Sequence, residues 1–565
     1  MKRAARHSKT SLLHLTLLAA LAALSPHAAF AQKPQDAAKP IQKGNEYLQK
    51  KDWKGAREQF QKAVRADARN VEANYGLGVA QMNLRQTADA LAAFSNVIAE
   101  KPNPRVREAL ISIGAIHFTL QHYKEAADAL GQAAPLGDLG PKGNYILGQC
   151  YFQSGQYDKA LEYLRRSTSD PQTAPEAYTA VGLLLLRQNR GREAVEPLEQ
   201  ATRLAPQNAT ARMALGNAYL VAERPEDALT TLRAADQNQF FTQYALGYAH
   251  LALYHDEEAL AAFNAALKFQ PQSPEALVGL GNVYTRLLRY READDAFARA
   301  LALKADSVEA LMGQAILHYY QGHYPSLVET ARRAAQLAPQ NAGAQTLLGA
   351  ALATTGDMAG GLRAAQAAAR LEPENYWPHH VLGFIQVRED KAKEALTEAR
   401  AAARLKPNEP ATQNLLAYVL NQLGQHAEAL QAAQAALSHK HEPADEGWAY
   451  YNVATAQEKL NRPEEAKASY TASIRAYNQT GRTLDPDDLY LMGNAYLRLE
   501  QDPAAVKAFQ QAIKVRPDFP QARYNLGVAY FTTGNRKGAQ EEYNALRRLD
   551  PARAAKLQAV ISGRK

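Results

Sequence analysis

The 34 residues from Pro274 to Ser307, PEALVGLGNVYTRLLRYREADDAFARALALKADS, decide how this chain folds. Gly281 is the eighth residue of this stretch, Ala293 the twentieth and Phe297 the twenty-fourth. Apolar residues recur around these positions at helical spacing in two separate blocks, which predicts a hairpin of two helices with one apolar stripe each. Small residues at positions 8 and 20 let the two helices approach closely.

The same arrangement recurs along the chain, and most successive units are 34 residues apart, with intervals of 36, 31, 37 and 39 as the exceptions. A fixed period of this length is typical of stacked helical repeats. The sequence therefore predicts about fifteen units between residues 37 and 553, whose position-8 residues are Gly44, Gly78, Gly114, Gly148, Gly182, Gly216, Gly247, Gly281, Ala315, Gly349, Gly383, Ala417, Ala454, Gly493 and Gly527.

Several units carry a Leu-Gly pair followed by a Tyr, then an Ala, a bulky residue and a Pro at position 32. In these features the chain resembles the tetratricopeptide repeat family, although the Trp of the family's fourth position is missing throughout. The pair and its Tyr are intact at Leu147-Gly148 with Tyr151, Leu215-Gly216 with Tyr219, Leu280-Gly281 with Tyr284 and Leu526-Gly527 with Tyr530. The resemblance implies an all-α, right-handed superhelical solenoid.

Capping residues are consistent with the helix boundaries that the repeat predicts. Polar N-cap residues precede the first helices at Asn70, Asn208, Ser273, Ser307, Asn341 and Asn375. Glycines that favour a left-handed C-cap stand in the turn between the first and second helices, at Gly155, Gly322, Gly356, Gly424 and Gly534. One hairpin cannot bury its apolar faces alone, so neighbouring hairpins must stack.

Longer connections at Ser438–Glu446 and Tyr477–Asp487 flank the thirteenth unit. They are interpreted either as surface loops or as a hinge. We therefore divide the solenoid into units 1–12 over residues 37–442 and units 13–15 over residues 443–553. The tail, Ala554–Lys565, is predicted to be a helix that covers the last apolar face.

The first 31 residues have the three parts of a secretory signal peptide. Lys2, Arg3, Arg6 and Lys9 are basic, Leu12 to Leu24 are apolar, and Ala29-Phe30-Ala31 matches a cleavage site before Gln32. Residues 32–36 then form a linker. The prediction is a periplasmic or secreted protein of bacterial type. No later stretch of 18 apolar residues predicts a membrane span.

Composition narrows the function. After cleavage, 61 basic residues face 57 acidic ones, which is too balanced for a nucleic-acid-binding surface. Cys150 is the only cysteine, so no internal disulfide can form, and we interpret it as a small core residue. The chain has no recognisable catalytic motif, and Gly279-Leu280-Gly281 is interpreted as helix packing rather than a dinucleotide loop. We predict no enzyme activity, no cofactor and no metal.

Histidines occupy positions 11 and 16 of three units, in the pairs His117/His122, His250/His255 and His318/His323. Five residues along a helix separate side chains by about 140°, a poor geometry for chelation. Histidine at position 11 is therefore interpreted as a packing substitute for the family's Tyr. The sequence His439-Lys440-His441 in a loop is a weaker candidate for metal binding.

The resemblance also implies that positions 2, 5, 9 and 12 of the first helices face a concave groove. Six units have a tyrosine at position 5, and these rings either bind a ligand or pack between helices. They are Tyr75, Tyr145, Tyr244, Tyr451, Tyr490 and Tyr524. Asn494 and Asn525 match two asparagines of the family's carboxylate clamp, although Tyr490 stands where a basic residue is expected. We predict one cluster of Tyr490, Asn494, Tyr524 and Asn525.

Taken together, these features predict a non-catalytic scaffold of a bacterial cell envelope that binds other proteins on its concave face. The partners expected are components of an envelope or secretion complex. The alternative is an adaptor for polysaccharide export or biosynthesis, whose groove tyrosines stack on sugars.

Overall fold

The computed structural model describes residues 35–438 and 443–563, and within these ranges every regular element is a helix. The predicted signal peptide and the sequence His439-Lys440-His441 lie outside the described residues. The chain divides into two compact units, Met1–Ala222 and Glu223–Lys565. The first helix begins at Gln35, so the last two residues of the predicted linker, 32–36, belong to this helix.

The first unit contains eleven described α-helices and two short 3₁₀ helices. Their bounds are α1 (Gln35–Gln49), α2 (Trp53–Ala66), α3 (Val71–Asn83), α4 (Thr87–Ala99), α5 (Val106–Thr119), α6 (Tyr123–Ala133), η1 (Ala134–Leu136), α7 (Gly140–Gln153), α8 (Tyr157–Arg166), η2 (Ser167–Ser169), α9 (Ala174–Arg187), α10 (Gly191–Leu204) and α11 (Ala209–Val221).

The second unit contains the described helices α12 to α31. The first ten are α12 (Pro225–Arg233), α13 (Phe240–Ala252), α14 (Asp256–Phe269), α15 (Pro274–Arg286), α16 (Tyr290–Leu303), α17 (Val308–Gln321), α18 (Tyr324–Leu337), α19 (Ala342–Thr355), α20 (Met358–Leu371) and α21 (Tyr376–Arg388). They are followed by α22 (Ala392–Leu405), α23 (Pro410–Gln422), α24 (His426–Leu437), α25 (Pro443–Lys459), α26 (Pro463–Gln479), α27 (Pro486–Arg498), α28 (Asp502–Val515), α29 (Pro520–Thr532), α30 (Arg536–Leu549) and α31 (Pro551–Ile561).

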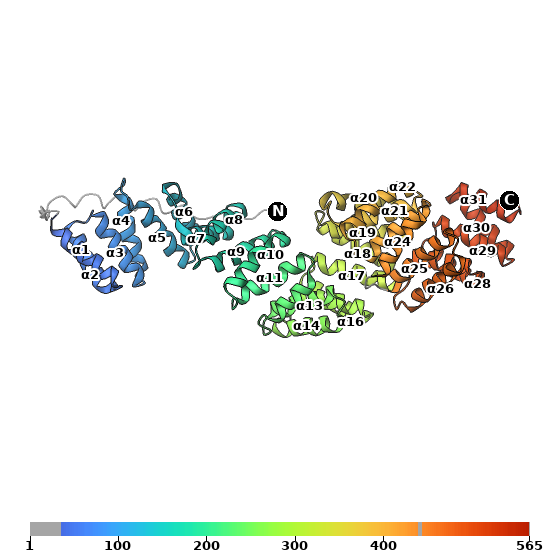
Figure 1. Ribbon diagram of the computed structural model, residues 1–565, viewed down its shortest axis with the longest axis horizontal. Helices are drawn as coiled ribbons and strands as arrows, with labels where there is room; N and C mark the ends of the chain where they lie inside the picture. Colours follow the sequence, from blue (N-terminus) through green and yellow to red (C-terminus); the bar gives the residue numbers. More distant parts are fainter. Residues whose placement is uncertain (1–34, 439–442, 564–565) are drawn as a thin grey trace, which may run out of the picture. The chain divides into compact units, whose positions relative to one another are not determined.

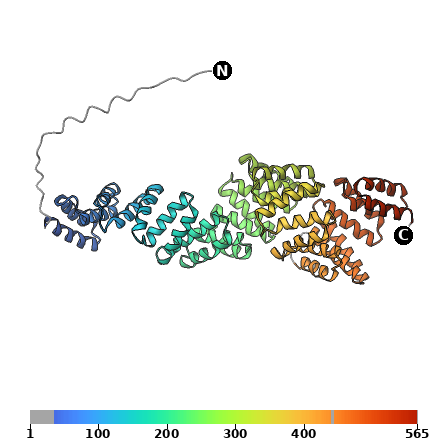
Figure 2. The same ribbon diagram turned by 90° about the horizontal axis from the view of Figure 1, so that it is seen from above.

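Odd-numbered helices are the first helices of the predicted hairpins and even-numbered helices are the second. Within each unit, helices follow one another as hairpins (Figures 1 and 2). A first helix packs on its own second helix, as α1 does on α2 and α15 on α16, and also on the first helix of the next hairpin, as α5 does on α7 and α21 on α23. Within each unit, the first helices therefore form an inner row. The predicted all-α solenoid of about fifteen hairpins is confirmed.

The capping predictions are confirmed in detail. The N-cap side chains of Asn70, Asn208, Ser273, Ser307, Asn341 and Asn375 each accept a hydrogen bond from a backbone N–H in the first turn of the following helix. The five turn glycines have φ between 73° and 104°. In ten other turns, a non-glycine residue such as Leu288 or Asp390 adopts the same left-handed conformation, with φ near 60°. Sequence reasoning did not identify those turns, because it looked for glycine.

Glycines at the repeat positions make room for the bulky residue at position 24. A Cβ atom added at Gly281 would lie 2.7 Å from a ring carbon of Phe297, and one added at Gly279 would lie 2.3 Å from Phe263. Both glycines are therefore packing residues of α15, as predicted, and not part of a phosphate-binding loop. Phe263 and Phe297 are fully buried.

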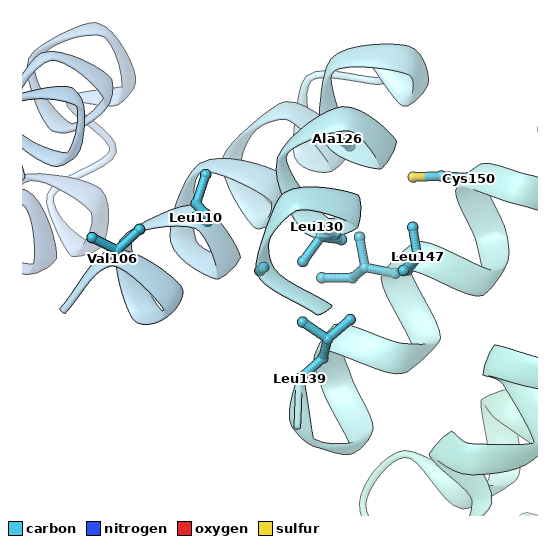
Figure 3. Packing of buried hydrophobic residues seen from close by; sticks show 9 residues of the cluster. Val106, Leu110, Ala126, Leu130, Leu139, Leu147 and Cys150 are labelled. Carbon is cyan, nitrogen blue, oxygen red and sulfur yellow. The ribbon is translucent and has the colours of Figure 1, made fainter. Parts of the chain in front are cut away.

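Cys150 lies in the core of the first unit. It packs with Leu130 of α6 and Leu147 of α7 in a buried apolar cluster (Figure 3). Burial raises the pKa of the Cys150 thiol to about 11, so the thiol stays protonated and unreactive near neutral pH. The interpretation of Cys150 as a core residue is consistent with this environment.

The last helix, α31, covers the end of the second unit. It runs over Pro551–Ile561, three residues earlier than predicted from Ala554, and packs on α29 and α30. Its Leu557 and Ala554 are buried against Leu546 of α30. The predicted terminal helix is therefore present, and it begins earlier because Pro551 serves as its first residue and Asp550 as its N-cap.

Candidate ligand groove and cavity

The position-5 tyrosines are half-buried on the inner row, and most of them pack on the bulky position-24 residue of their own hairpin. Ring centroids are 5.8 Å apart for Tyr75 and Phe94, 6.2 Å for Tyr244 and Phe263, 5.8 Å for Tyr451 and Tyr470, and 6.1 Å for Tyr490 and Phe509. Tyr145 packs against the cluster around Leu147. These contacts hold one side of each ring within the solenoid.

Three residues of the predicted cluster of Tyr490, Asn494, Tyr524 and Asn525 are linked by side-chain contacts. The Asn525 amide donates to Asn494 Oδ1 at 2.6 Å, and the Asn494 amide donates to the Tyr451 hydroxyl at 3.5 Å. Tyr490 adjoins the two asparagines, whose hydrogen bonds partly offset the rise that burial causes in its pKa. Tyr524 packs against the cluster of Leu546, Ala554 and Leu557, where α31 contacts α29.

The histidine pairs do not have the geometry predicted for a continuous helix. The helix turns before the second histidine of each pair, so His122, His255 and His323 are N-cap residues of α6, α14 and α18. The turn brings the ring centroids of the three pairs to 5.8, 5.7 and 6.2 Å. Among the described residues, no group of three or more His, Cys, Asp or Glu side chains is arranged to hold a metal ion.

A cavity of about 490 Å³ lies on the inner face of the second unit. Helix α21 supplies Trp377, His380, Phe384 and Val387 to its wall, and these are positions 2, 5, 9 and 12 of one repeat. Other first helices add the rings of Tyr319, Tyr320, Tyr418, Trp448 and Tyr490 to the wall, and Phe519, the N-cap of α29, adds a further ring. The groove positions that the family resemblance implies therefore do meet around one hollow.

Four of these rings form a continuous wall. His380 and Phe384 are 6.4 Å apart and stacked, and Trp448 lies edge-on to both, at 6.5 and 6.4 Å. Tyr418 lies 6.3 Å from Trp448. Burial lowers the pKa of His380 to about 4, so this imidazole is neutral at physiological pH.

A loop of residues 480–485, between α26 and α27, closes one side of the cavity; we call it the bridging loop. The Thr483 N–H donates to the Tyr320 carbonyl at 3.1 Å. The Tyr319 hydroxyl donates to Asp485 Oδ2 at 2.9 Å, and the Tyr324 hydroxyl lies 3.4 Å from the Leu484 carbonyl. The connection predicted as a surface loop or a hinge is thus held against α17 and α18.

Ion pairs reinforce this closure beneath the bridging loop. Asp487 accepts hydrogen bonds from Arg388 of α21 and, at 2.5 Å, from Arg516, whose side chain is only 1% exposed. Arg516 also donates to the Thr354 carbonyl at 3.2 Å. Arg482 pairs with Asp488 at 2.9 Å, and burial raises the pKa of Asp488 to about 7.

A further ion pair joins the last helix, α31, to the turn that follows α21. Arg553 of α31 donates to Asp390 at 2.8 Å, and the Gln521 amide of α29 donates to the Arg388 carbonyl at 3.2 Å. The inner face of the second unit is therefore bridged by contacts between helices that lie far apart in the sequence.

Sequence reasoning missed the cavity because it searched only position 5 for tyrosine. Trp377 and Trp448 are two of the three tryptophans in the chain, and both stand at position 2 of their repeats. Tyr418 and Phe384 stand at position 9. A search of all four groove positions for any aromatic residue would have indicated this wall, whereas Arg388 and Asp487 carry no local signal of their pairing.

None of the described helices has the length and apolar character needed to span a lipid bilayer. The candidate binding site among the described residues is the inner face of the helical hairpins in the second unit, around the ring-lined cavity.

Comparisons with known proteins agree with this architecture. Models described as "Tetratricopeptide repeat" match residues 41–103, 80–144, 180–239, 276–307, 386–447, 449–480 and 520–553, and one described as "TPR repeat" matches residues 493–534. A model described as "Anaphase-promoting complex, cyclosome, subunit 3" matches residues 140–200. A comparison with curated proteins found no match.

Among solved structures, "Crystal structure of APC/C hetero-tetramer Cut9-Hcn1" contains a similar chain, with a TM-score of 0.53 at 14% sequence identity. The similarity covers 87% of this chain and 96% of that chain. At this identity the likeness concerns the fold, which is a stack of helical hairpins in both proteins.

Proposed function

This chain belongs to the tetratricopeptide repeat family, and from that premise we propose that it is a non-catalytic scaffold of a bacterial cell envelope, which binds segments of partner proteins on the inner face of its first helices. The observation that carries the proposal is the ring-lined cavity of about 490 Å³ at the groove positions of the second unit. Solenoids of this kind use their extended inner surfaces for binding.

The chemistry of the cavity favours binding over catalysis. Asp487 and Asp488 are engaged by arginines, and His380 is neutral and buried in an aromatic wall. A general base needs a proton to abstract within hydrogen-bond reach, and a nucleophile needs an adjacent base. The rings instead supply large, rigid contact surfaces that lose little entropy on binding.

Location in the envelope rests on the signal-peptide features of residues 1–31. Mass spectrometry of the protein isolated from the envelope fraction of its native cells tests this part of the proposal. We expect a mature N-terminus at Gln32. An intact Met1 in a cytoplasmic fraction would contradict export.

Partner binding can be tested with a photo-crosslinking amino acid. Ile316 on α17 lines the cavity and is partly exposed, whereas Leu337 at the end of α18 is exposed on a second helix. With p-benzoylphenylalanine at Ile316, we expect a discrete cross-linked partner in intact cells. The same substitution at Leu337 is the control and should not give that product. Equal products at both positions, or none at Ile316, would contradict binding on the inner face.

The second candidate, an adaptor for polysaccharide export, is favoured by one observation: the rings of Trp377 and Trp448 line the cavity, where they can stack on sugars. Binding of purified cell-surface glycan to the full chain, with loss on Trp448→Ala, would favour this alternative.

A further inference from the structure

The cavity lies within a part of the second unit that closes on itself. All seven first helices from α17 to α29 contribute side chains to its wall. The Thr483 N–H donates to the Tyr320 carbonyl at 3.1 Å. The Arg516 guanidinium donates to the Thr354 carbonyl at 3.2 Å. Because these contacts join helices far apart in the sequence, the wall returns on itself and bounds a space of limited length, which suits a discrete small molecule.

The charged side chains of the wall are already engaged. Three ion pairs connect most of them: Arg388 with Asp487, Arg482 with Asp488, and Arg553 with Asp390. Asp485 accepts a hydrogen bond from the Tyr319 hydroxyl at 2.9 Å, and Asp445 is also engaged. A charged ligand would lose its hydration without meeting a free counter-charge among these residues, and burying an unpaired charge is costly. The wall therefore favours an uncharged ligand.

Neutral polar side chains of the wall also have partners within the protein. The Thr354 hydroxyl donates to a backbone carbonyl of its own helix at 2.9 Å. The Gln521 amide donates to the backbone carbonyl of Arg388 at 3.2 Å. Burial raises the pKa of Tyr418, and hydrogen bonding with Gln422 partly offsets this rise. These polar groups do not require a ligand to satisfy them.

The nitrogen atoms that lack partners do not face the cavity. They are Nδ1 of His380, Nε1 of Trp448, and Nε and Nη1 of Arg388, and each of these atoms is buried. A molecule inside the cavity therefore cannot reach them, although their side chains belong to the wall. Packing against the wall, rather than hydrogen bonding to these nitrogens, must supply the binding free energy.

Rings and small side chains give this wall its shape. Rings predominate on α21, α23 and α25, where Phe384, Tyr418 and Trp448 form part of the continuous aromatic wall. Helix α19 contributes the small side chains of Ala350 and Ala351. The volume of about 490 Å³ lies in the range of small-molecule sites, roughly 300–1,000 Å³. Aromatic rings attract other rings edge-to-face or in offset stacks beyond the effect of buried area.

We propose that this cavity binds a small, uncharged aromatic molecule, held by contacts with the rings of Phe384, Tyr418 and Trp448. The inference goes beyond the proposed function, because it gives the scaffold a small-molecule ligand in addition to its protein partners. An aromatic ligand is favoured over an alkyl chain of the same volume, since only a ring gains the additional attraction between aromatic groups.

Two fluorescent probes with the same three-ring skeleton test the proposal on the full mature chain. N-phenyl-1-naphthylamine is uncharged, whereas 8-anilinonaphthalene-1-sulfonate carries a sulfonate. We expect saturable binding of the uncharged probe and at least about tenfold weaker binding of the sulfonate, because the wall has no free counter-charge for it. Equal or tighter binding of the sulfonate, or no saturable binding of the uncharged probe, would overturn the proposal.

Two variants of matched size locate the site. Ala350→Trp fills the cavity and should weaken binding of N-phenyl-1-naphthylamine at least about tenfold, since little volume remains for the probe. Ala298→Trp, on the exposed face of α16, should leave its affinity unchanged. Melting temperatures show whether each variant is folded. Unchanged affinity in a folded Ala350→Trp variant would contradict binding in the cavity.

Energy transfer from tryptophan locates the probe without filling the cavity. The chain has three tryptophans: Trp377 and Trp448 line the cavity, and Trp53 begins α2 in the first unit. Replacing Trp377 and Trp448 with Phe should remove most of the transfer to bound N-phenyl-1-naphthylamine, whose directly excited emission still reports its binding. Undiminished transfer from Trp53 alone would place the probe in the first unit and overturn the assignment.

Displacement by 1-dodecanol provides the competing outcome. Tighter binding of this alkyl chain than of N-phenyl-1-naphthylamine would overturn the choice of an aromatic ligand. If photo-crosslinking at Ile316 captures a partner protein but the uncharged probe does not bind, the ligand inference fails while the proposed scaffold function stands.

Discussion

The Tyr319 hydroxyl donates a 2.9 Å hydrogen bond to Asp485, although 166 positions separate the two residues in the sequence. Tyr319 belongs to the ninth hairpin, and Asp485 is the N-cap of the first helix of the fourteenth. In a simple repeat stack each hairpin contacts only its neighbours. In the second unit, therefore, the stack also contacts itself across its inner face, and this contact closes one side of the cavity.

Replacing Gly281 with Leu should destabilise the protein by about 1–3 kcal/mol or more, because the added side chain must displace the buried ring of Phe297. Thermal denaturation followed by circular dichroism measures the effect. Gly131→Leu is the matched control, since a Cβ at Gly131 meets no atom within 4 Å. Equal melting temperatures for Gly281→Leu and the parent would show that α15 does not pack as described.

Asp487→Ala should cost about 3–5 kcal/mol, because it leaves the buried guanidinium groups of Arg388 and Arg516 without their counter-ion. Urea denaturation gives the change in unfolding free energy. For comparison, Glu541→Ala removes an exposed pair with Lys537 and should change stability by about 0–1 kcal/mol. Comparable losses for the two variants would argue against a buried network at Asp487.

Tyr490→Ala should lower the melting temperature, because the ring centroids of Tyr490 and Phe519 are 5.1 Å apart; losing a fully buried aromatic costs about 3–5 kcal/mol, and this half-buried ring should cost less. Tyr490→Phe keeps that packing and should be far less destabilising. The same pair of variants at Tyr524 shows the role of a ring that packs against the end cluster of Leu546, Ala554 and Leu557. If Tyr490→Ala instead weakens partner capture with an unchanged melting temperature, the ring acts as a ligand anchor and not as core.

His380 should make stability depend on pH between about 4 and 6.5. Its pKa is lowered by burial in the native state, so over this range the unfolded chain binds a proton that the native chain does not. Stability contributed by the neutral imidazole is complete above the unfolded pKa and is lost as pH falls, with a slope of up to about 1.4 kcal/mol per pH unit.

Melting temperatures of the parent and of His380→Phe, measured from pH 4 to 7, check this expectation. The variant should show a shallower decrease at low pH. Substitution of the exposed His122 by Phe is the control, and its melting temperature should depend on pH as that of the parent does. Parallel curves for the parent and His380→Phe would mean that this histidine is protonated equally in both states.

The sequence predicted the hairpins because their determinants are local. Gly281 and Phe297 recur at a fixed spacing, and Asn70 or Ser273 needs only the next turn of helix to act as a cap. Left-handed turns at Leu288 and Asp390 escaped prediction because the hairpin imposes that conformation on residues that do not favour it.

The cavity could be predicted only in part. The register implies that Trp377, His380 and Phe384 share one face of α21, since positions on a helix follow from its period, but the search for tyrosine at position 5 did not use these residues. The pairing of Arg388 with Asp487 could not be predicted, because it depends on how far the superhelix turns between hairpins eleven and fourteen. Small errors in the angle between hairpins accumulate over that distance, so a local pattern does not determine it.

The bridging loop and its ion pairs also determine which parts of the second unit can open alone. A stack held only by neighbouring hairpins frays from its end, one hairpin at a time. Here α29 and α31 are tied back to α21 and its following turn through Gln521 and Arg553, so they cannot detach without breaking contacts elsewhere in the unit. Hydrogen exchange should therefore find α17 to α31 protected as one cooperative block, while the terminal hairpin α1–α2 of the first unit exchanges by local fraying.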